Sequence, residues 1–130
     1  MPTDYKGAFD EFQRFAQGDD AHAQYMLGIM YGLGLGVAQD YMTSIDWYER
    51  AAAAGNAPAQ CNLGWMYGTG RGVPQDFIQA LAWYSLAAAS GQDTARQNRD
   101  LLNEKMTPNQ VEQAQTMARD VSTKMREARA

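Results

Sequence analysis

The sequence predicts an all-helical chain built from stacked pairs of helices. The first observation is a repeat, because half of the 36 positions are identical when residues 19–54 are aligned with residues 55–90. A repeat of this length is typical of stacked supersecondary units. The second observation is that apolar residues recur every three or four positions within each half of the repeat. The third is that glycine follows each of these segments, where a helix would end.

The first expected helix covers residues 4–17 and begins at Asp4, whose carboxylate suits an N-cap. Its apolar positions match those of the second helix of repeat 1 at the same offset of 36 residues. The sequence is therefore expected to open with a partial unit that contributes one helix. The matching apolar residues are Tyr5, Ala8, Phe9, Phe12 and Ala16.

Each full unit is expected to hold two helices. The first helix ends where several glycines occur close together, because such a run holds helical order poorly. An aspartate then caps the second helix, Asp40 in repeat 1 and Asp76 in repeat 2, and a left-handed glycine closes it at Gly55 or Gly91. The four helices are expected at residues 21–33, 41–54, 57–69 and 77–90.

Gly28 and Gly64 stand inside the first helices, at the same position of the two units. A glycine inside a helix costs about 1 kcal/mol relative to alanine. Its presence in both units indicates that a Cβ atom would clash there. The sequence therefore predicts that each glycine packs against an aromatic residue on the second helix of its own unit.

The remaining residues form a partial third unit, 91–105, with one helix at 93–104, and a C-terminal segment, 106–130. The tetrapeptide that starts at Thr107 combines a capping box with proline at the first helical position. We expect a helix over 108–127 that caps the repeats, since its apolar residues share one face and charged residues the other. An amphipathic helix that binds a partner is the alternative.

The pattern LGxMYGxGxGVxQDxxxAxxWYxxAAxxG, which the two units share, resembles the Sel-1-like repeat, a relative of the tetratricopeptide repeat. The resemblance covers residues 4–105 and points to a bacterial protein. It implies an α/α solenoid that curves into a right-handed superhelix, with the first helices on the concave side. It also implies a scaffold or adaptor that holds partner proteins together.

Charge and hydropathy exclude two classes of partner. The chain has 15 acidic and 11 basic residues, a formal net charge of −4, whereas non-specific nucleic-acid binding requires many cations. Residues 21–39 are uncharged and contain a GxxxG motif, but the equivalent segment of repeat 2 carries Arg71 and two prolines. A membrane span does not accommodate these residues. We expect neither nucleic-acid binding nor membrane insertion.

No catalytic or metal-binding set is visible, so the chain is not expected to be an enzyme or to need a cofactor. The glycine loops lack GxGxxG and GK[ST] spacing and follow a helix C-terminus, which repels phosphate. Cys61 and His22 occupy different positions of the repeat, and one cysteine with one histidine cannot build a usual zinc site. The alternative is a hydrolase of β-lactam or cell-wall type. That activity is claimed for a cysteine-rich branch of the resembled family, whose paired cysteines this sequence lacks.

The resemblance places the variable residues of the first helices on the concave face, where we expect a partner protein or peptide to bind. Trp65 is the best single anchor, because tryptophan beside tyrosine, methionine and asparagine is typical of peptide-binding surfaces. Few basic residues are expected there, which favours apolar anchors over an acidic tail. The alternative is a groove too shallow to bind, with Trp65 covered by Trp47 or the tail. The expected binding residues are Tyr25, Met26, Ile29, Cys61, Asn62, Trp65, Gln97 and Asn98.

The chain is expected to be a single repeat domain and a monomer. Its first residues show no basic segment followed by an apolar run, so the sequence predicts a cytoplasmic protein. A periplasmic or secreted location is the alternative if a signal peptide has been removed.

Overall fold

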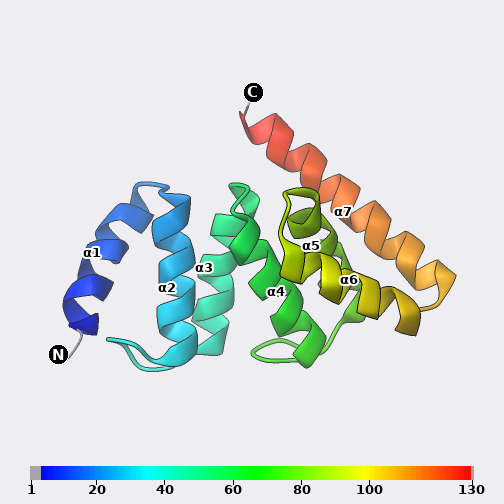
Figure 1. The fold of residues 1–130 in the computed structure, drawn as a ribbon. Helices are drawn as coiled ribbons and strands as arrows, with labels where there is room; N and C mark the ends of the chain where they lie inside the picture. The colour runs from blue at the N-terminus through cyan, green and yellow to red at the C-terminus, as the bar shows by residue number, and fades with distance from the viewer. Residues whose placement is uncertain (1–3, 130) are drawn as a thin grey trace.

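The structure is a computed structural model that describes residues 4–129. These residues form seven α-helices and no strand (Figure 1). The predicted all-helical fold is confirmed, and every helix begins and ends within two residues of the prediction. The helices are α1 (Tyr5–Gln17), α2 (Ala21–Leu33), α3 (Tyr41–Ala53), α4 (Ala57–Thr69), α5 (Phe77–Ala89), α6 (Asp93–Lys105) and α7 (Pro108–Arg129).

The predicted caps are found at the start of the helices. The side chains of Asp4, Asp40 and Asp76 accept hydrogen bonds from backbone N–H groups two or three residues further along. Asp20 and Asn56 do the same for α2 and α4. A cap of this kind stabilises a helix by about 1 kcal/mol. Short polar side chains therefore determine where these five helices begin.

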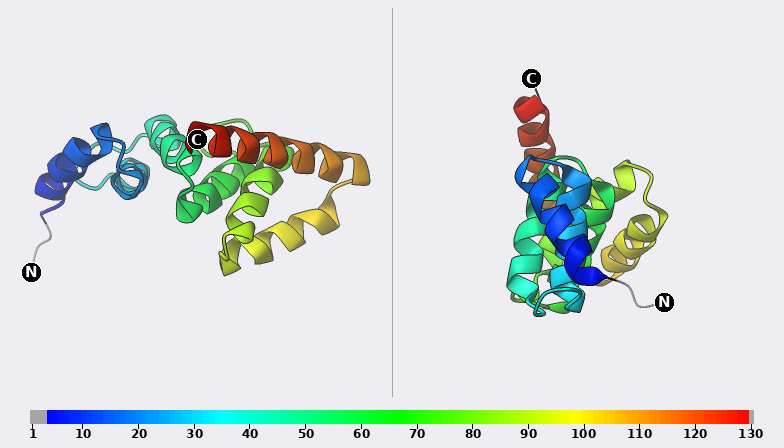
Figure 2. Two further views of the ribbon diagram at one scale, coloured as in Figure 1. Left: turned by 90° about the horizontal axis from the view of Figure 1, so that it is seen from above. Right: turned by 90° about the vertical axis from the view of Figure 1, so that its left-hand side faces the viewer.

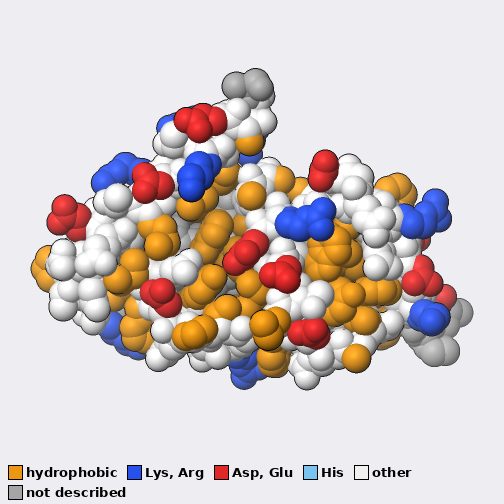
Figure 3. Space-filling model, turned by 180° about the vertical axis from the view of Figure 1, so that it is seen from behind, with side chains coloured by type: hydrophobic (Ala, Val, Ile, Leu, Met, Phe, Trp, Pro, Cys, Tyr) orange, Lys and Arg blue, Asp and Glu red, His pale blue; other side chains and the backbone are white. Residues whose placement is uncertain are grey.

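From α1 to α6, consecutive helices pack against each other, with α2 against α3 and α4 against α5 as the two pairs of the repeat. Seen from above, α4 and α6 lie on one side of the molecule and α3 and α7 on the other (Figure 2). The face with α3 and α7 carries acidic side chains among its exposed hydrophobic ones (Figure 3). The molecule thus presents two different faces, one with α4 and α6 and the other with α3 and α7.

The glycines inside the first helices allow the two helices of a pair to approach closely. A Cβ atom at Gly28 would lie 2.5 Å from the ring of Tyr48, and one at Gly64 would lie 2.7 Å from the ring of Tyr84. Both tyrosines belong to the second helix of the same unit. The prediction that each glycine packs against an aromatic residue of its own unit is confirmed.

The C-terminal helix α7 packs on α5. It begins with the predicted capping box, in which the Thr107 N–H donates to Gln110 Oε1 and the Gln110 N–H donates to Thr107 Oγ1. Its apolar face covers Leu81 and Ala82 of α5, and its far end reaches repeat 1, where Arg129 donates to the Ala54 carbonyl. The apolar face of α7 therefore packs against another helix of the same chain.

Candidate binding groove

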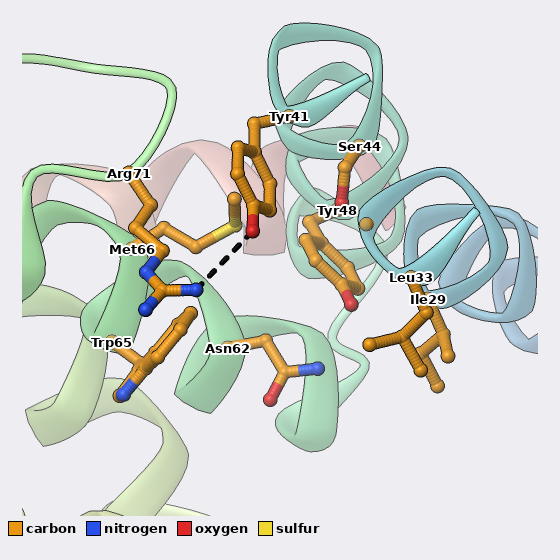
Figure 4. A pocket seen from close by; sticks show the side chains of 10 residues that line it. Ile29, Leu33, Tyr41, Ser44, Tyr48, Asn62, Trp65, Met66 and Arg71 are labelled. Atoms are coloured by element: carbon orange, nitrogen blue, oxygen red, sulfur yellow. Dashed lines mark hydrogen bonds between the residues drawn. The ribbon is translucent and has the colours of Figure 1, made fainter. Parts of the chain in front are cut away.

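A hollow of about 260 Å³ opens between α2, α3 and α4 (Figure 4). We call it the first hollow. Its walls are mainly aliphatic and aromatic, and its polar groups include the Asn62 amide and the Arg71 guanidinium. It is smaller than a typical small-molecule site of about 300–1,000 Å³, so it suits a side chain better than a whole ligand. Its lining residues are Ile29, Gly32, Leu33, Tyr41, Ser44, Tyr48, Asn62, Trp65, Met66 and Arg71.

A second hollow of about 210 Å³ lies between α4, α5 and α6. Trp65 lines both hollows, so its indole forms the ridge between them. Trp65 is 44% exposed, which means that neither Trp47 nor the tail covers it. Trp47 packs against the α1–α2 core instead. The second hollow is lined by Trp65, Gly68, Thr69, Phe77, Tyr84, Asn98, Leu101, Leu102 and Lys105.

Arg71 enters the first hollow from the loop between α4 and α5. Its guanidinium carbon lies 4.9 Å from the centre of the Trp65 ring and 5.9 Å from that of Tyr41, and its Nη1 donates to the Tyr41 hydroxyl at 3.2 Å (Figure 4). Contacts of this kind between a cation and aromatic faces are favourable. They hold the guanidinium at the rim of the first hollow.

Gly72 explains how the loop brings Arg71 to that place. Its φ of 76° lies in the left-handed region, and a Cβ atom there would lie 2.7 Å from the Cβ of Tyr41. Only glycine allows both this conformation and this approach without strain. The loop of repeat 2 therefore rests on the start of α3, which puts the preceding residue, Arg71, beside Tyr41.

The tyrosines at the base of the hollows are neutral groups. Burial raises the pKa of Tyr48, and burial raises the pKa of Tyr84 to about 12. Both hydroxyls are therefore protonated at neutral pH, where they can donate hydrogen bonds but do not act as nucleophiles. The Ser44 hydroxyl makes a structural hydrogen bond, because it donates to the Gly28 carbonyl.

The structure brings four of the eight predicted binding residues to the two hollows. Ile29, Asn62 and Trp65 line the first, and Asn98 lines the second with Trp65. Each hollow therefore receives one of the predicted asparagines.

The other four predicted residues lie outside the lining of both hollows. Tyr25 is half-buried with its ring 6.1 Å from that of Tyr48, and Met26 and Gln97 lie elsewhere on the first helices. Cys61 is 8% exposed and packs in the core with Tyr84. Its expected place on the concave surface is corrected, because its position on α4 faces α5.

Sequence reasoning missed the residues that reach the hollows from outside the first helices. Arg71 comes from a loop and Tyr41 from a second helix. Each hollow holds one basic side chain, Arg71 in the first and Lys105 in the second. One signal was available, because Arg71 replaces Leu35 at the equivalent position of an otherwise similar loop.

The candidate catalytic and metal-binding residues lie apart. The ring of His22 contacts those of Phe12 and Tyr25, whereas Cys61 packs with Tyr84 and Ala95 in a different cluster. Among residues 4–129, no three His, Cys, Asp or Glu side chains come close enough to hold a metal ion. His22 and Cys61 therefore do not form a pair among the described residues.

Burial raises the pKa of the Cys61 thiol above its ordinary value. The reactive thiolate is therefore scarcer at a given pH in the folded chain than in the unfolded one. We expect Cys61 to react with a disulfide reagent at pH 8 far more slowly in buffer than in denaturant, with reactivity rising only at higher pH. Equal rates in both solvents would contradict the burial.

Comparison with known proteins explains the repeat. A model of the Sel1 repeat matches residues 21–56 and 57–92, which together exceed half of the chain. The chain belongs to the Sel1 repeat family. Proteins with Sel1 repeats generally mediate protein–protein interactions, and their fold is typically a non-catalytic scaffold. A search of curated proteins gives no match.

Two solved structures share the Sel1 repeat fold with this chain. One is c5321, a protective antigen of uropathogenic Escherichia coli strains, with 31% identity over 92% of this chain and a TM-score of 0.88. The other is a Sel1 repeat protein from Oxalobacter formigenes, with 32% identity over 75% of this chain and a TM-score of 0.72. The matches span 26% and 40% of those longer chains.

None of the helices formed by residues 4–129 is long and apolar enough to cross a membrane. The uncharged segment 21–39, which contains the GxxxG motif, is divided between α2 and the glycine loop that follows it.

Proposed function

We propose that this Sel1 repeat chain is a scaffold that binds a segment of a partner protein in the groove formed by the two hollows, and that it acts by binding and not by catalysis. The observation that carries the proposal is Trp65, a large aromatic side chain that is nearly half exposed on the central first helix. A single exposed hydrophobic residue is ordinary. Trp65 differs because it separates two concave, largely apolar surfaces.

The chemistry of the groove supports a peptide as ligand. Binding hot spots are enriched in tryptophan, tyrosine and arginine, and all three meet at the rim of the first hollow in Trp65, Tyr41 and Arg71. The hollows also carry Asn62 and Asn98. Their side-chain amides can each donate to a peptide carbonyl and accept from a peptide N–H.

The test begins by selecting ligands for the full chain from a phage-displayed library of random peptides, followed by affinity measurements with synthetic peptides. We expect Trp65→Ala to weaken binding by about 30-fold, the equivalent of about 2 kcal/mol for a hot spot. Thermal stability is expected to change little, because Trp65 is not part of the core clusters of residues 4–129.

Phe15→Ala is the matched control, since Phe15 is another exposed aromatic residue and lines neither hollow. It is expected to leave peptide affinity unchanged. Peptides that bind Trp65→Ala as tightly as the natural chain would overturn the proposed function. A Trp65→Ala variant that melts at a much lower temperature than the natural chain would show that the residue belongs to the core.

A further inference from the structure

The two hollows have a charge opposite to that of the whole chain. The formal net charge is −4, yet no aspartate or glutamate lines either hollow. Each hollow instead contains one basic side chain, Arg71 in the first and Lys105 in the second. The opposite face carries both acidic and basic side chains (Figure 3). The local charge of the groove is therefore positive on an acidic protein.

Both basic side chains are available to a ligand. Within residues 4–129 the ion pairs are those of Arg96 with Asp93 and of Arg99 with Asp100, so neither Arg71 nor Lys105 pairs with a described carboxylate. A guanidinium has five N–H donors, and Arg71 uses one of its donors in the described residues, on Tyr41.

Arg71 is also already oriented. The rings of Trp65 and Tyr41 hold its guanidinium at the rim of the first hollow. A side chain that is ordered before binding loses less conformational entropy when a ligand arrives. A carboxylate is the natural partner for such a group, because it can accept two parallel N–H bonds from one guanidinium.

Each basic group stands beside a surface for an apolar side chain. In the first hollow Arg71 lies beside Trp65 and Tyr41, and Ile29 and Leu33 form the apolar wall across the hollow from it (Figure 4). In the second, Lys105 lies next to Leu101, whose side chain is exposed. A dry cavity of about 150 Å³ holds a benzene molecule, so hollows of about 260 and 210 Å³ each suit one branched or aromatic side chain.

We propose, building on the binding function above, that the ligand is an acidic peptide segment in which apolar side chains stand next to aspartate or glutamate. One apolar side chain enters the first hollow while its neighbouring carboxylate binds Arg71. The segment passes over Trp65 and places a second apolar side chain in the second hollow, with a carboxylate on Lys105. This assignment differs from the sequence-based expectation, which favoured apolar anchors over an acidic tail, because Arg71 reaches the first hollow from the loop between α4 and α5.

The same peptide selection provides the test. We expect the selected peptides to be enriched in aspartate and glutamate beside leucine, isoleucine or phenylalanine. Arg71→Gln should weaken their binding by about tenfold, and Arg71→Lys by less, because lysine keeps the charge but not the bidentate geometry. Affinity should fall as salt is added. Replacing the peptide's acids with their amides should weaken binding to the natural chain in the same way, without altering the protein.

Arg50→Gln is the matched control. Arg50 lies 4.5 Å from the centre of the Trp47 ring, much as Arg71 lies over Trp65, but it lines neither hollow. Its replacement removes the same charge and the same type of contact, and it should leave peptide affinity unchanged. An equal loss in Arg50→Gln and Arg71→Gln would overturn the inference, because net charge alone would then explain the effect.

The remaining outcomes separate this inference from the proposed function. Peptides that require Trp65 but are neutral or basic, and that bind Arg71→Gln normally, would overturn the acidic ligand and leave the binding function standing. If no selected peptide depends on Trp65, both the proposed function and this inference fail.

Discussion

Gly64→Leu is expected to lower the free energy of unfolding by about 3 kcal/mol or more. A Cβ atom at position 64 would lie 2.7 Å from the Tyr84 ring, closer than side chains pack. Tyr84 is buried and has little room to move, so the added side chain must push α4 away from α5. Urea denaturation followed by circular dichroism measures the loss as a lower midpoint.

Alanine variants give this prediction a matched control within one helix. Gly64→Ala should destabilise the chain, although alanine favours a helix over glycine by about 1 kcal/mol. Gly68→Ala should be neutral or stabilising, because its Cβ would lie 3.6 Å from that of Ala80, an ordinary contact. If Gly64→Ala and Gly68→Ala have the same stability, the close approach of α4 and α5 does not exist.

Leu27→Ala is expected to cost about 2–5 kcal/mol, since it leaves a cavity in the core. Leu27 is completely buried in a cluster with Phe9, Ala23 and Met30, which joins α1 to α2. The midpoint of thermal or urea unfolding should therefore fall well below that of the natural chain.

Leu33→Ala makes the same change on the same helix at a side chain that is 66% exposed. Surface substitutions of this kind change stability by less than about 0.5 kcal/mol. Leu33 also lines the first hollow, so this variant can weaken peptide binding while stability is kept. A Leu27→Ala variant as stable as Leu33→Ala would contradict the position of Leu27 in the core.

The features that sequence reasoning predicted correctly depend on residues close to one another in the chain. The caps at Asp40 and Asp76 bond to backbone groups within three residues. The contacts of Gly28 and Gly64 lie within one helix pair. Each of these features occurs in both repeat units. The sequence alone therefore determined the fold class, the helix bounds and the glycine–tyrosine contacts.

The positions of the side chains that line the groove depend on tertiary structure. The loops of the two units share the same glycine spacing, and Gly36 and Gly72 have φ angles of 73° and 76°. Yet Leu35 packs against the core between α1 and α2, whereas Arg71 lies over Trp65. The difference arises because a loop side chain is placed by the neighbouring unit on which the loop rests.

The packing of the C-terminal helix also depends on tertiary structure. Its apolar face could be predicted from the spacing of residues such as Val111 and Ala114, but not the surface that this face covers. It packs on α5 and reaches Ala54 of repeat 1. Periodicity determines which face of a helix is apolar. The surface that this face covers depends on complementarity between residues that are far apart in the chain. Only the tertiary structure brings those residues together.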